Sequence, residues 1–237
     1  MEMVPRTFFF AGKAAPAYRL AKLIIKFINL VGTIDSELAE RGRIKVVFLT
    51  EYNVSLAERL IPASDVSNQI STAGYEASGT SNMKFMTNGA LTVGTRDGAT
   101  IERAEEAGEE NMFFFGVTGE QVENSRSWNS PHWHYEHEPE TRAALDLIFP
   151  DYFNRNEPGV FAPLRDTPLL SGDHYMHLAD LTSYVQAQER LGALYRDSGA
   201  WEQKAILNVA SFGKFSSDRT IQEYATEIWK AEPCPMP

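Results

Sequence analysis

The first half of the chain alternates short apolar runs with helical patterns, and this alternation constrains the fold more than any other feature. The apolar runs are rich in β-branched and aromatic residues and show no strict alternation of polar and apolar positions; they lie at 7–11, 44–50, 91–95 and 112–117. Runs of this kind are typical of parallel strands that are buried on both faces. A weaker strand is expected at 69–72.

Helical patterns lie between these runs, at 16–31, 55–61, 81–88 and 97–107. The order predicts an α/β fold with a doubly wound, mostly parallel Rossmann-like sheet and right-handed crossovers. Ligands of such sheets bind beyond the carboxyl ends of the strands. The loops expected to carry function are therefore those at 12–16, 51–55, 73–81 and 96–99.

The second half of the chain differs in character. Residues 125–177 hold all five histidines, and we expect long connections there with one helix at 140–149. From residue 180 onward the pattern is helical. We therefore divide the chain into a sheet-containing part, residues 1–178, and a C-terminal helical segment, residues 179–237, that packs on the sheet.

Charge and composition exclude several classes of partner. The net charge of −10 disfavours a broad electrostatic attraction to nucleic acid or to anionic lipid, so neither is expected as a partner. No run of about 18 consecutive apolar residues is present, and we expect no membrane span. The single cysteine, Cys234, excludes a disulfide scaffold and favours a cytoplasmic location.

The stretch "GYEASGTSNMKFMTNGA", residues 74–90, carries the strongest chemical signal. Gly79 and its small neighbours allow the backbone to approach a ligand closely. The helix expected from Ser81 has unpaired N–H groups and a positive dipole end, which together favour a bound phosphate. A nucleotide-binding P-loop is not matched, because Thr80 follows Gly79 where that motif requires lysine.

Lys84 lies four residues after Thr80, near the start of the same predicted helix. Its neighbours Met83, Phe85 and Met86 are apolar, so we expect a partly buried amine. Such an amine can act as a nucleophile and form a Schiff base. Pyridoxal phosphate has an aldehyde and a phosphate, and it would join the lysine to the helix N-terminus. A surface lysine on an amphipathic helix remains the alternative.

Residues 76–102, "EASGTSNMKFMTNGALTVGTRDGATIE", closely resemble the pyridoxal-phosphate lysine segment of the α-glucan phosphorylases, which act on glycogen, starch and maltodextrin. Three more segments resemble the same family in the same order: "PRTFFFAGKAAPAYRLAKLIIKFIN", "KVVFLTEYNVSLAERLIPASDVSNQISTAG" and "GKFSSDRTIQEYATEIW". The resemblance weakens only between about 125 and 180. It implies the C-terminal half of a GT-B-type glycosyltransferase, with C-terminal helices beyond the sheet.

The resemblance also assigns roles to residues around the cofactor. Lys84 would carry pyridoxal 5'-phosphate covalently and would be the catalytic residue. Gly79 and Thr80 would bind the cofactor phosphate through their backbone N–H groups. Tyr52 would lie on a loop that abuts the cofactor.

A second set of residues would bind the sugar. Glu76, together with the backbone of Ala77, Ser78 and Gly79, would hydrogen-bond the hydroxyl groups of the glucosyl unit. The transition state of the expected reaction is oxocarbenium-like, so these contacts should matter most there.

The reaction implied by the resemblance is reversible phosphorolysis of an α-1,4-glucan. Orthophosphate would attack the terminal glucose and release glucose 1-phosphate with retention, while the cofactor phosphate relays a proton. The family's chain is several times longer, and its N-terminal domain would lie before Met1. We therefore expect a C-terminal piece that is inactive alone, taken from an allosteric enzyme that forms a homodimer. Ala17 and Ser81 stand where many relatives have glycine.

Two other functions remain as alternatives to a phosphorylase: a non-catalytic α/β domain that binds an anion or a partner protein, and a pyridoxal enzyme that acts on amino acids. No metal is expected. The histidines of "PHWHYEHE", His132, His134 and His137, match no metal-binding spacing, and we expect an exposed aromatic loop there.

The last predicted helix, at 218–230, is amphipathic. Ile221, Ile228 and Trp229 fall on one face, which is expected either to pack in the core or to dock on the N-terminal domain.

Overall fold

The computed structural model describes residues 4–37, 43–148 and 152–234. The elements of the first half, which contains all the described strands, are β1 (Arg6–Ala11), α1 (Arg19–Glu37), β2 (Ile44–Leu49), α2 (Val54–Leu60), β3 (Val66–Gln69), α3 (Ser81–Thr87), β4 (Leu91–Thr95), α4 (Gly98–Ala107), the short η1 (Glu109–Asn111) and β5 (Phe113–Phe115). The second half is helical and contains α5 (Gly119–Ser125), α6 (Pro131–His137), α7 (Pro139–Ile148), α8 (Ala162–Leu170), α9 (His177–Leu194), α10 (Ser198–Ala210), η2 (Ser211–Phe215), α11 (Ser217–Glu223) and η3 (Tyr224–Ile228).

The strands are parallel, as predicted, but they form two sheets and not one. β1 pairs with β2 in the first sheet, and the second sheet has the order β3-β4-β5. The α/β class and the parallel pairing are confirmed, whereas the single continuous sheet is wrong for the described residues. The sheet is divided between β1 and β3, because no backbone hydrogen bond between described residues joins these two strands.

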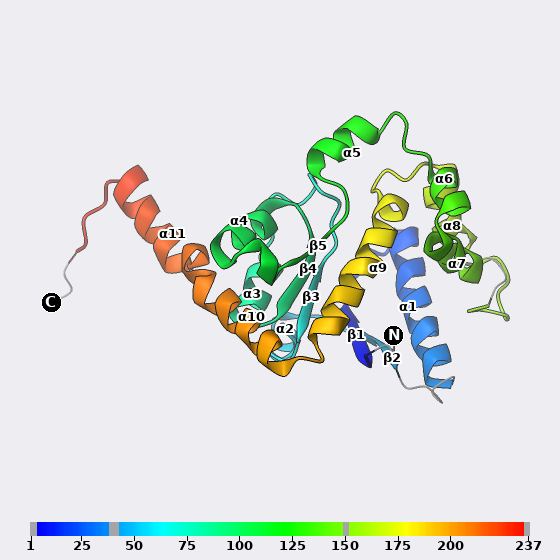
Figure 1. Ribbon diagram of the computed structural model, residues 1–237, viewed down its shortest axis with the longest axis horizontal. Helices are drawn as coiled ribbons and strands as arrows, with labels where there is room; N and C mark the ends of the chain where they lie inside the picture. The colour runs from blue at the N-terminus through cyan, green and yellow to red at the C-terminus, as the bar shows by residue number, and fades with distance from the viewer. Residues whose placement is uncertain (1–3, 38–42, 149–151, 235–237) are drawn as a thin grey trace.

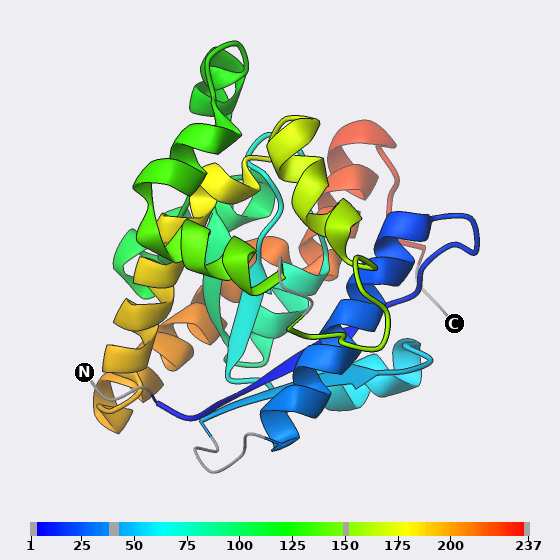
Figure 2. The same ribbon diagram turned by 90° about the vertical axis from the view of Figure 1, so that its right-hand side faces the viewer.

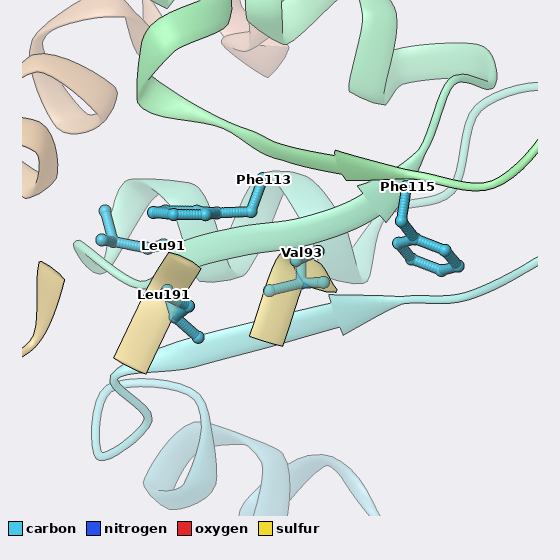
Figure 3. Close-up of a cluster of buried hydrophobic side chains, with 6 residues drawn as sticks. Leu91, Val93, Phe113, Phe115 and Leu191 are labelled. Carbon is cyan, nitrogen blue, oxygen red and sulfur yellow. The ribbon is translucent and has the colours of Figure 1, made fainter. Parts of the chain in front are cut away.

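The second sheet is the centre of the core, and helices cover both of its faces. Leu91 and Val93 of β4 are 0% exposed, and they pack with Phe113 and Phe115 of β5. Figure 3 shows these side chains beside Leu191, which α9 contributes from one face. On the other face α3, α4 and η2 pack together around a second buried cluster. Strands covered in this way are buried on both sides, which explains why all the residues at 91–95 are buried, Thr92 and Thr95 included.

The first sheet is more open. α1 packs on β2, and Phe27 of α1 contacts Phe153 and Phe161 edge to face at centroid distances of 5.0 and 5.1 Å. In β1, however, Phe9 is 51% exposed and Phe10 is 39% exposed. Figure 2 shows β1 and β2 at the margin of the molecule, beside the more central β3.

Residues 125–177 contain more helix than the sequence predicts. The helix expected at 140–149 is present as α7, but α6 and α8 were not foreseen. The predicted exposed loop at 132–137 is therefore wrong, because Pro131 begins a helix whose cap, Ser130, accepts a hydrogen bond from the Trp133 N–H at 3.4 Å. Aromatic and histidine residues at successive positions gave this helix no recognisable period.

Of the C-terminal elements, α10 and η2 pack against the second sheet and its helices, whereas α11 and η3 extend outward (Figure 1). Ile221, Ile228 and Trp229 are 59%, 63% and 62% exposed, so these residues do not pack in the core of the described chain. Among the described helices, none has both the length and the apolar character needed to cross a membrane.

Candidate functional site

A loop at 70–80 leads from the carboxyl end of β3 to α3, and its base is fixed by side chains. The Thr95 hydroxyl, at the carboxyl end of β4, donates to the Ser71 carbonyl at 2.7 Å. The Thr72 hydroxyl donates to the Tyr175 carbonyl at 2.7 Å. The loop is thus held at the edge of the sheet where ligands of parallel α/β folds bind, as predicted from the strand order.

Asp97 holds the middle of this loop against α4. Its Oδ2 accepts hydrogen bonds from the N–H groups of Tyr75 and Glu76 at 3.1 and 2.7 Å, and its Oδ1 accepts from the Gly98 N–H at 2.9 Å. Asp97 is also the N-cap of α4. The same carboxylate therefore caps a helix and sets the backbone position of Glu76.

Glycine is required at position 98 because the loop at 70–80 lies directly against the start of α4. The φ of Gly98 is +43°, and a Cβ added there would lie 2.3 Å from the Glu76 carbonyl oxygen. The loop at 96–99 is one of those expected to carry function, but the roles of Asp97 and Gly98 are not evident from the sequence. An Asp-Gly pair one residue after a buried strand was the available signal.

The turn into α3 places backbone donors at its surface. Gly79 has φ +80°, and Thr80 is the N-cap but makes no side-chain capping bond. Asn82 contributes instead, since its Nδ2 donates to the Ser78 carbonyl at 2.8 Å and its Oδ1 accepts from the Met83 N–H at 2.8 Å.

Three N–H groups at this turn remain available. Within the described part of the chain, the N–H groups of Gly79, Thr80 and Ser81 have no hydrogen-bond partner. A helix start of this kind carries partial positive charge and favours an anion. Ser78, Thr80 and Ser81 are exposed and Gly79 is half-buried, so a ligand can reach the turn.

Lys84 lies one helical turn beyond Thr80, because its N–H donates to the Thr80 carbonyl at 3.2 Å. The side chain of Lys84 is exposed, and the expectation of a partly buried amine is wrong for the described chain. The face of α3 that packs inward is the one that carries Asn82 and Met86, which are 3% and 0% exposed. The four-residue spacing places Lys84 and Thr80 on the same face.

Tyr52 approaches this helix from the first sheet. It follows β2, directly after Glu51, which has φ +55°, and it is half-buried. Tyr52, Ser81 and Phe85 line the same cleft of about 970 Å³. The structure thus brings Tyr52 and the start of α3 to one cleft, while Glu76 and Ala77 lie exposed on the adjoining loop.

The histidines of α6 contact residues of their own region. His134 Nε2 is within hydrogen-bonding distance of Asn129 Oδ1, at 3.1 Å, whereas His134 Nδ1 lies 3.2 Å from Glu138 Oε1 without forming a hydrogen bond among the described residues. The ring of His137 stacks on Trp133 at a centroid distance of 4.9 Å. Over residues 4–37, 43–148 and 152–234, no three His, Cys, Asp or Glu side chains gather in a way that could hold a metal ion.

Comparison with known proteins gives one family of matches. A family model described as carbohydrate phosphorylase matches residues 1–231. Glycogen phosphorylase of Synechocystis sp. is 49% identical over 98% of this chain and 28% of the relative. The brain forms of glycogen phosphorylase from Bos taurus and Homo sapiens are 52% and 50% identical, each over 97% of this chain and 27% of the relative.

These matches confirm the resemblance that the sequence motifs indicated, and they extend it across the region at 125–180, where the motifs are weak. The chain spans 27% to 28% of the length of these relatives. On this ground the chain belongs to the carbohydrate phosphorylase family.

Proposed function

We propose that this chain is the pyridoxal-phosphate-binding part of an α-glucan phosphorylase. Such a glycosyltransferase cleaves α-1,4-glucan with orthophosphate and releases glucose 1-phosphate. The observation that carries the proposal is one turn of α3, in which an exposed lysine lies above free backbone donors. The names of the relatives, glycogen phosphorylases, support the choice of substrate.

The donor set at the start of α3 fits the cofactor. The N–H groups of Gly79 and Thr80 are suited to a phosphate, and no acidic side chain lies in the first turn of α3 to repel it. The amine of Lys84 is suited to an aldehyde carbon. A molecule with both groups, pyridoxal 5'-phosphate, therefore has a partner at each end.

The residues of this chain would act as follows. Lys84 holds the cofactor, and Gly79 and Thr80 orient its phosphate. The bound cofactor supplies an acidic phosphate that can exchange a proton with the substrate phosphate. Tyr52 limits the site on the side of the first sheet, where it lines the cleft beside α3.

Sugar recognition is assigned to the loop before α3. The carboxylate of Glu76 and the backbone of Ala77, Ser78 and Gly79 hydrogen-bond glucosyl hydroxyls. Asp97 fixes the Glu76 backbone through its 2.7 Å hydrogen bond, so the carboxylate is presented from a positioned loop. Contacts that are held in place before the reaction stabilise the transition state without a reorganisation cost.

The proposal extends to the rest of the enzyme. The chain corresponds to about a quarter of the relatives' length, since it covers 27% to 28% of them. We propose that catalysis needs the remaining N-terminal domain, and that the whole enzyme is a cytoplasmic, allosteric homodimer. Adding a separately expressed N-terminal domain should then restore formation of glucose 1-phosphate.

The direct test is cofactor binding by the 237-residue chain. Incubation with pyridoxal phosphate should give an absorption band that borohydride removes, and the added mass should then lie on the Lys84 peptide. Lys84→Ala should abolish both signals, because it removes the amine that lies one helical turn after Thr80. Lys45, another exposed lysine, provides the matched control, and Lys45→Ala should keep both signals.

Label on Lys45 or on several lysines at once would contradict the proposal, since it would show only general amine reactivity. An external reaction of the bound cofactor with added amino acids would favour the amino-acid enzyme instead. Lack of any label on the wild-type chain would favour a non-catalytic anion-binding domain.

A further inference from the structure

Two tryptophans lie exposed on the segment at 126–137, which joins α5 to α6 and includes α6. Trp128 is 73% exposed and Trp133 is 51% exposed. Figure 1 shows this segment at the periphery of the molecule. Large aromatic side chains are enriched at binding surfaces, because they bury much apolar area at a low cost in conformational entropy. The two indoles therefore mark a surface that can bind a partner.

The backbone between the two indoles is held in place by Asn129. Its Nδ2 donates to the sulfur of the buried Met176 at 3.3 Å, and its Oδ1 lies 3.1 Å from His134 Nε2. Its backbone N–H donates to the Ser125 carbonyl at 2.7 Å. The indoles are thus presented from an ordered segment, so that a ligand would bind without first ordering the backbone.

The two rings differ in their neighbours. The His137 ring stacks on Trp133 at a centroid distance of 4.9 Å, with 14° between the planes, so it supports one face of that indole. The Trp128 side chain has neither a ring contact nor a hydrogen bond within the described part of the chain. Most of the Trp128 ring therefore faces water, and its Nε1–H is available to donate to a ligand.

The surroundings of the indoles are polar. The exposed side chains of this segment include several with hydrogen-bonding groups: Arg126, Ser127, Ser130, His132 and Glu136. A stable protein interface has a contiguous apolar centre that excludes water. Separate indoles among polar side chains suit a pyranose ring instead, because its C–H face packs on an aromatic plane while its hydroxyls reach the polar neighbours.

The start of the same segment contacts the loop that is proposed to bind the glucosyl unit. Arg126 Nη2 donates to the Tyr75 hydroxyl at 2.6 Å, and the guanidinium lies 5.8 Å from the centroid of the Tyr75 ring. Tyr75 directly precedes Glu76 and is itself 48% exposed. The segment that carries the two indoles therefore adjoins the loop at 70–80.

We propose that Trp128 and Trp133 form an attachment surface for α-glucan, separate from the loop that binds the reacting sugar. The choice of ligand rests on the proposed function, since relatives of this chain are named glycogen phosphorylases. Glycogen is a branched polymer with many chain ends. One chain bound to the indoles keeps other ends of the same particle near Glu76, and this raises their effective concentration without any change in the contacts to the reacting sugar.

Co-sedimentation with glycogen tests the proposal in the absence of pyridoxal phosphate and orthophosphate, and therefore separately from the proposed activity. The 237-residue chain should sediment with glycogen, and free maltoheptaose should release it. Trp128→Ala and Trp133→Ala should each weaken the binding at least ~5-fold, and the double variant should weaken it further. Trp128→Phe keeps an aromatic face and should lose less than Trp128→Ala.

Trp229 provides the matched control. It is 62% exposed, in the same range as the other two, but it lies at the end of η3. Trp229→Ala should therefore sediment with glycogen as the wild type does. Urea denaturation should give similar stabilities for the wild type and for the variants at 128 and 229, because an exposed side chain contributes little to the core.

Absence of glycogen binding by the wild-type chain would overturn the proposal. So would binding that Trp128→Ala and Trp133→Ala leave unchanged, or that Trp229→Ala weakens equally. Binding that Glu76→Ala abolishes while both tryptophan variants retain it would assign the attachment to the sugar loop and would also overturn the proposal. Self-association that Trp128→Ala abolishes, without glycogen binding, would assign the surface to a second copy instead.

The proposed function can fail independently of this surface. Glycogen binding that depends on Trp128 and Trp133, in a chain that pyridoxal phosphate does not label at Lys84, would contradict the cofactor role and support the attachment surface. Labelling at Lys84 without glycogen binding would support the cofactor role and overturn the attachment surface.

Discussion

The two sheets of this chain are built from similar strands but differ in what covers them. The run "LTVGT" forms β4, in which every residue is buried. The run "RTFFFA" forms β1, in which Phe9 is 51% exposed. An apolar run therefore specifies a strand in both places, but burial depends on elements that lie elsewhere in the chain. β4 has paired neighbours on both edges, whereas β1 has only β2.

The largest expected difference between the sheets is in the cost of losing one apolar side chain. Leu91→Ala should lower the free energy of unfolding by ~2–5 kcal/mol, because Leu91 is 0% exposed within the core cluster. Phe9→Ala should cost less than ~1 kcal/mol, because about half of this side chain is in water in the folded chain. Urea denaturation measures both values. Equal losses would mean that β1 is as well packed as β4.

A buried charge on α4, which covers the second sheet, extends the comparison. Arg103 of α4 is 0% exposed, and burial lowers the pKa of its guanidinium to about 10. Its Nη2 donates to Thr92 Oγ1 at 2.5 Å, but its Nη1 has no partner among the described residues. Arg103→Met should therefore raise the free energy of unfolding by ~1–3 kcal/mol, since a poorly compensated charge is replaced by an apolar side chain of similar length.

The control for this prediction is Arg59→Met on α2, where the arginine is exposed. This variant should change stability by no more than ~0.5 kcal/mol. A destabilised Arg103→Met variant would show that the hydrogen bonds of the guanidinium to Thr92 Oγ1 and Met86 Sδ outweigh its desolvation.

The smallest effect depends on pH and concerns Asp180, which packs beside the end of β5. Burial raises the pKa of its carboxyl to about 6, against the lowering effect of the Val117 N–H, and Asp173 raises it further while His134 lowers it. The folded-state pKa lies above the unfolded value of 3.8, so this group lowers stability as pH rises from about 4 to about 6.

Asp180→Asn keeps an oxygen for the Val117 N–H, which Asp180 Oδ1 accepts at 2.9 Å, and removes the charge. The variant and the wild type should have similar stability near pH 4, and the variant should be more stable by about 1 kcal/mol near pH 7. Urea titrations at both pH values check this. A difference that is independent of pH would mean that the carboxyl has the same pKa in the folded and unfolded states.

The local sequence pattern predicted most of the helices and strands. It failed where pairing with distant parts of the chain determines the structure. The run at 91–95 is β4 at those bounds, and the helix predicted at 81–88 is α3, Ser81–Thr87. The strand expected at 69–72 lies at Val66–Gln69, because polar residues there conceal the pairing with β4. The gap between β1 and β3 had no local signal, since it reflects pairing across the sheet and not the sequence of either strand.

The sequence indicated which loops and residues form the candidate site, but not how their side chains are exposed or hydrogen-bonded. The loops at 73–81 and 96–99 do meet, and glycine at 79 has the positive φ that its position in the turn requires. The exposure of Lys84 was missed, because apolar neighbours along a helix point in different directions around its axis. The role of Asp97 was missed because its partners, Tyr75 and Glu76, lie about twenty residues earlier in the chain.

The double role of Asp97 has a mechanical consequence. One carboxylate holds the first turn of α4 and the peptide groups of Tyr75 and Glu76 at the same time. Gly98 leaves no room between the loop and the helix, so the two cannot slide independently. Any rigid-body displacement of α4 would thus carry the Glu76 backbone with it, and events at the far end of that helix would be transmitted to the loop at 70–80 as a change in position.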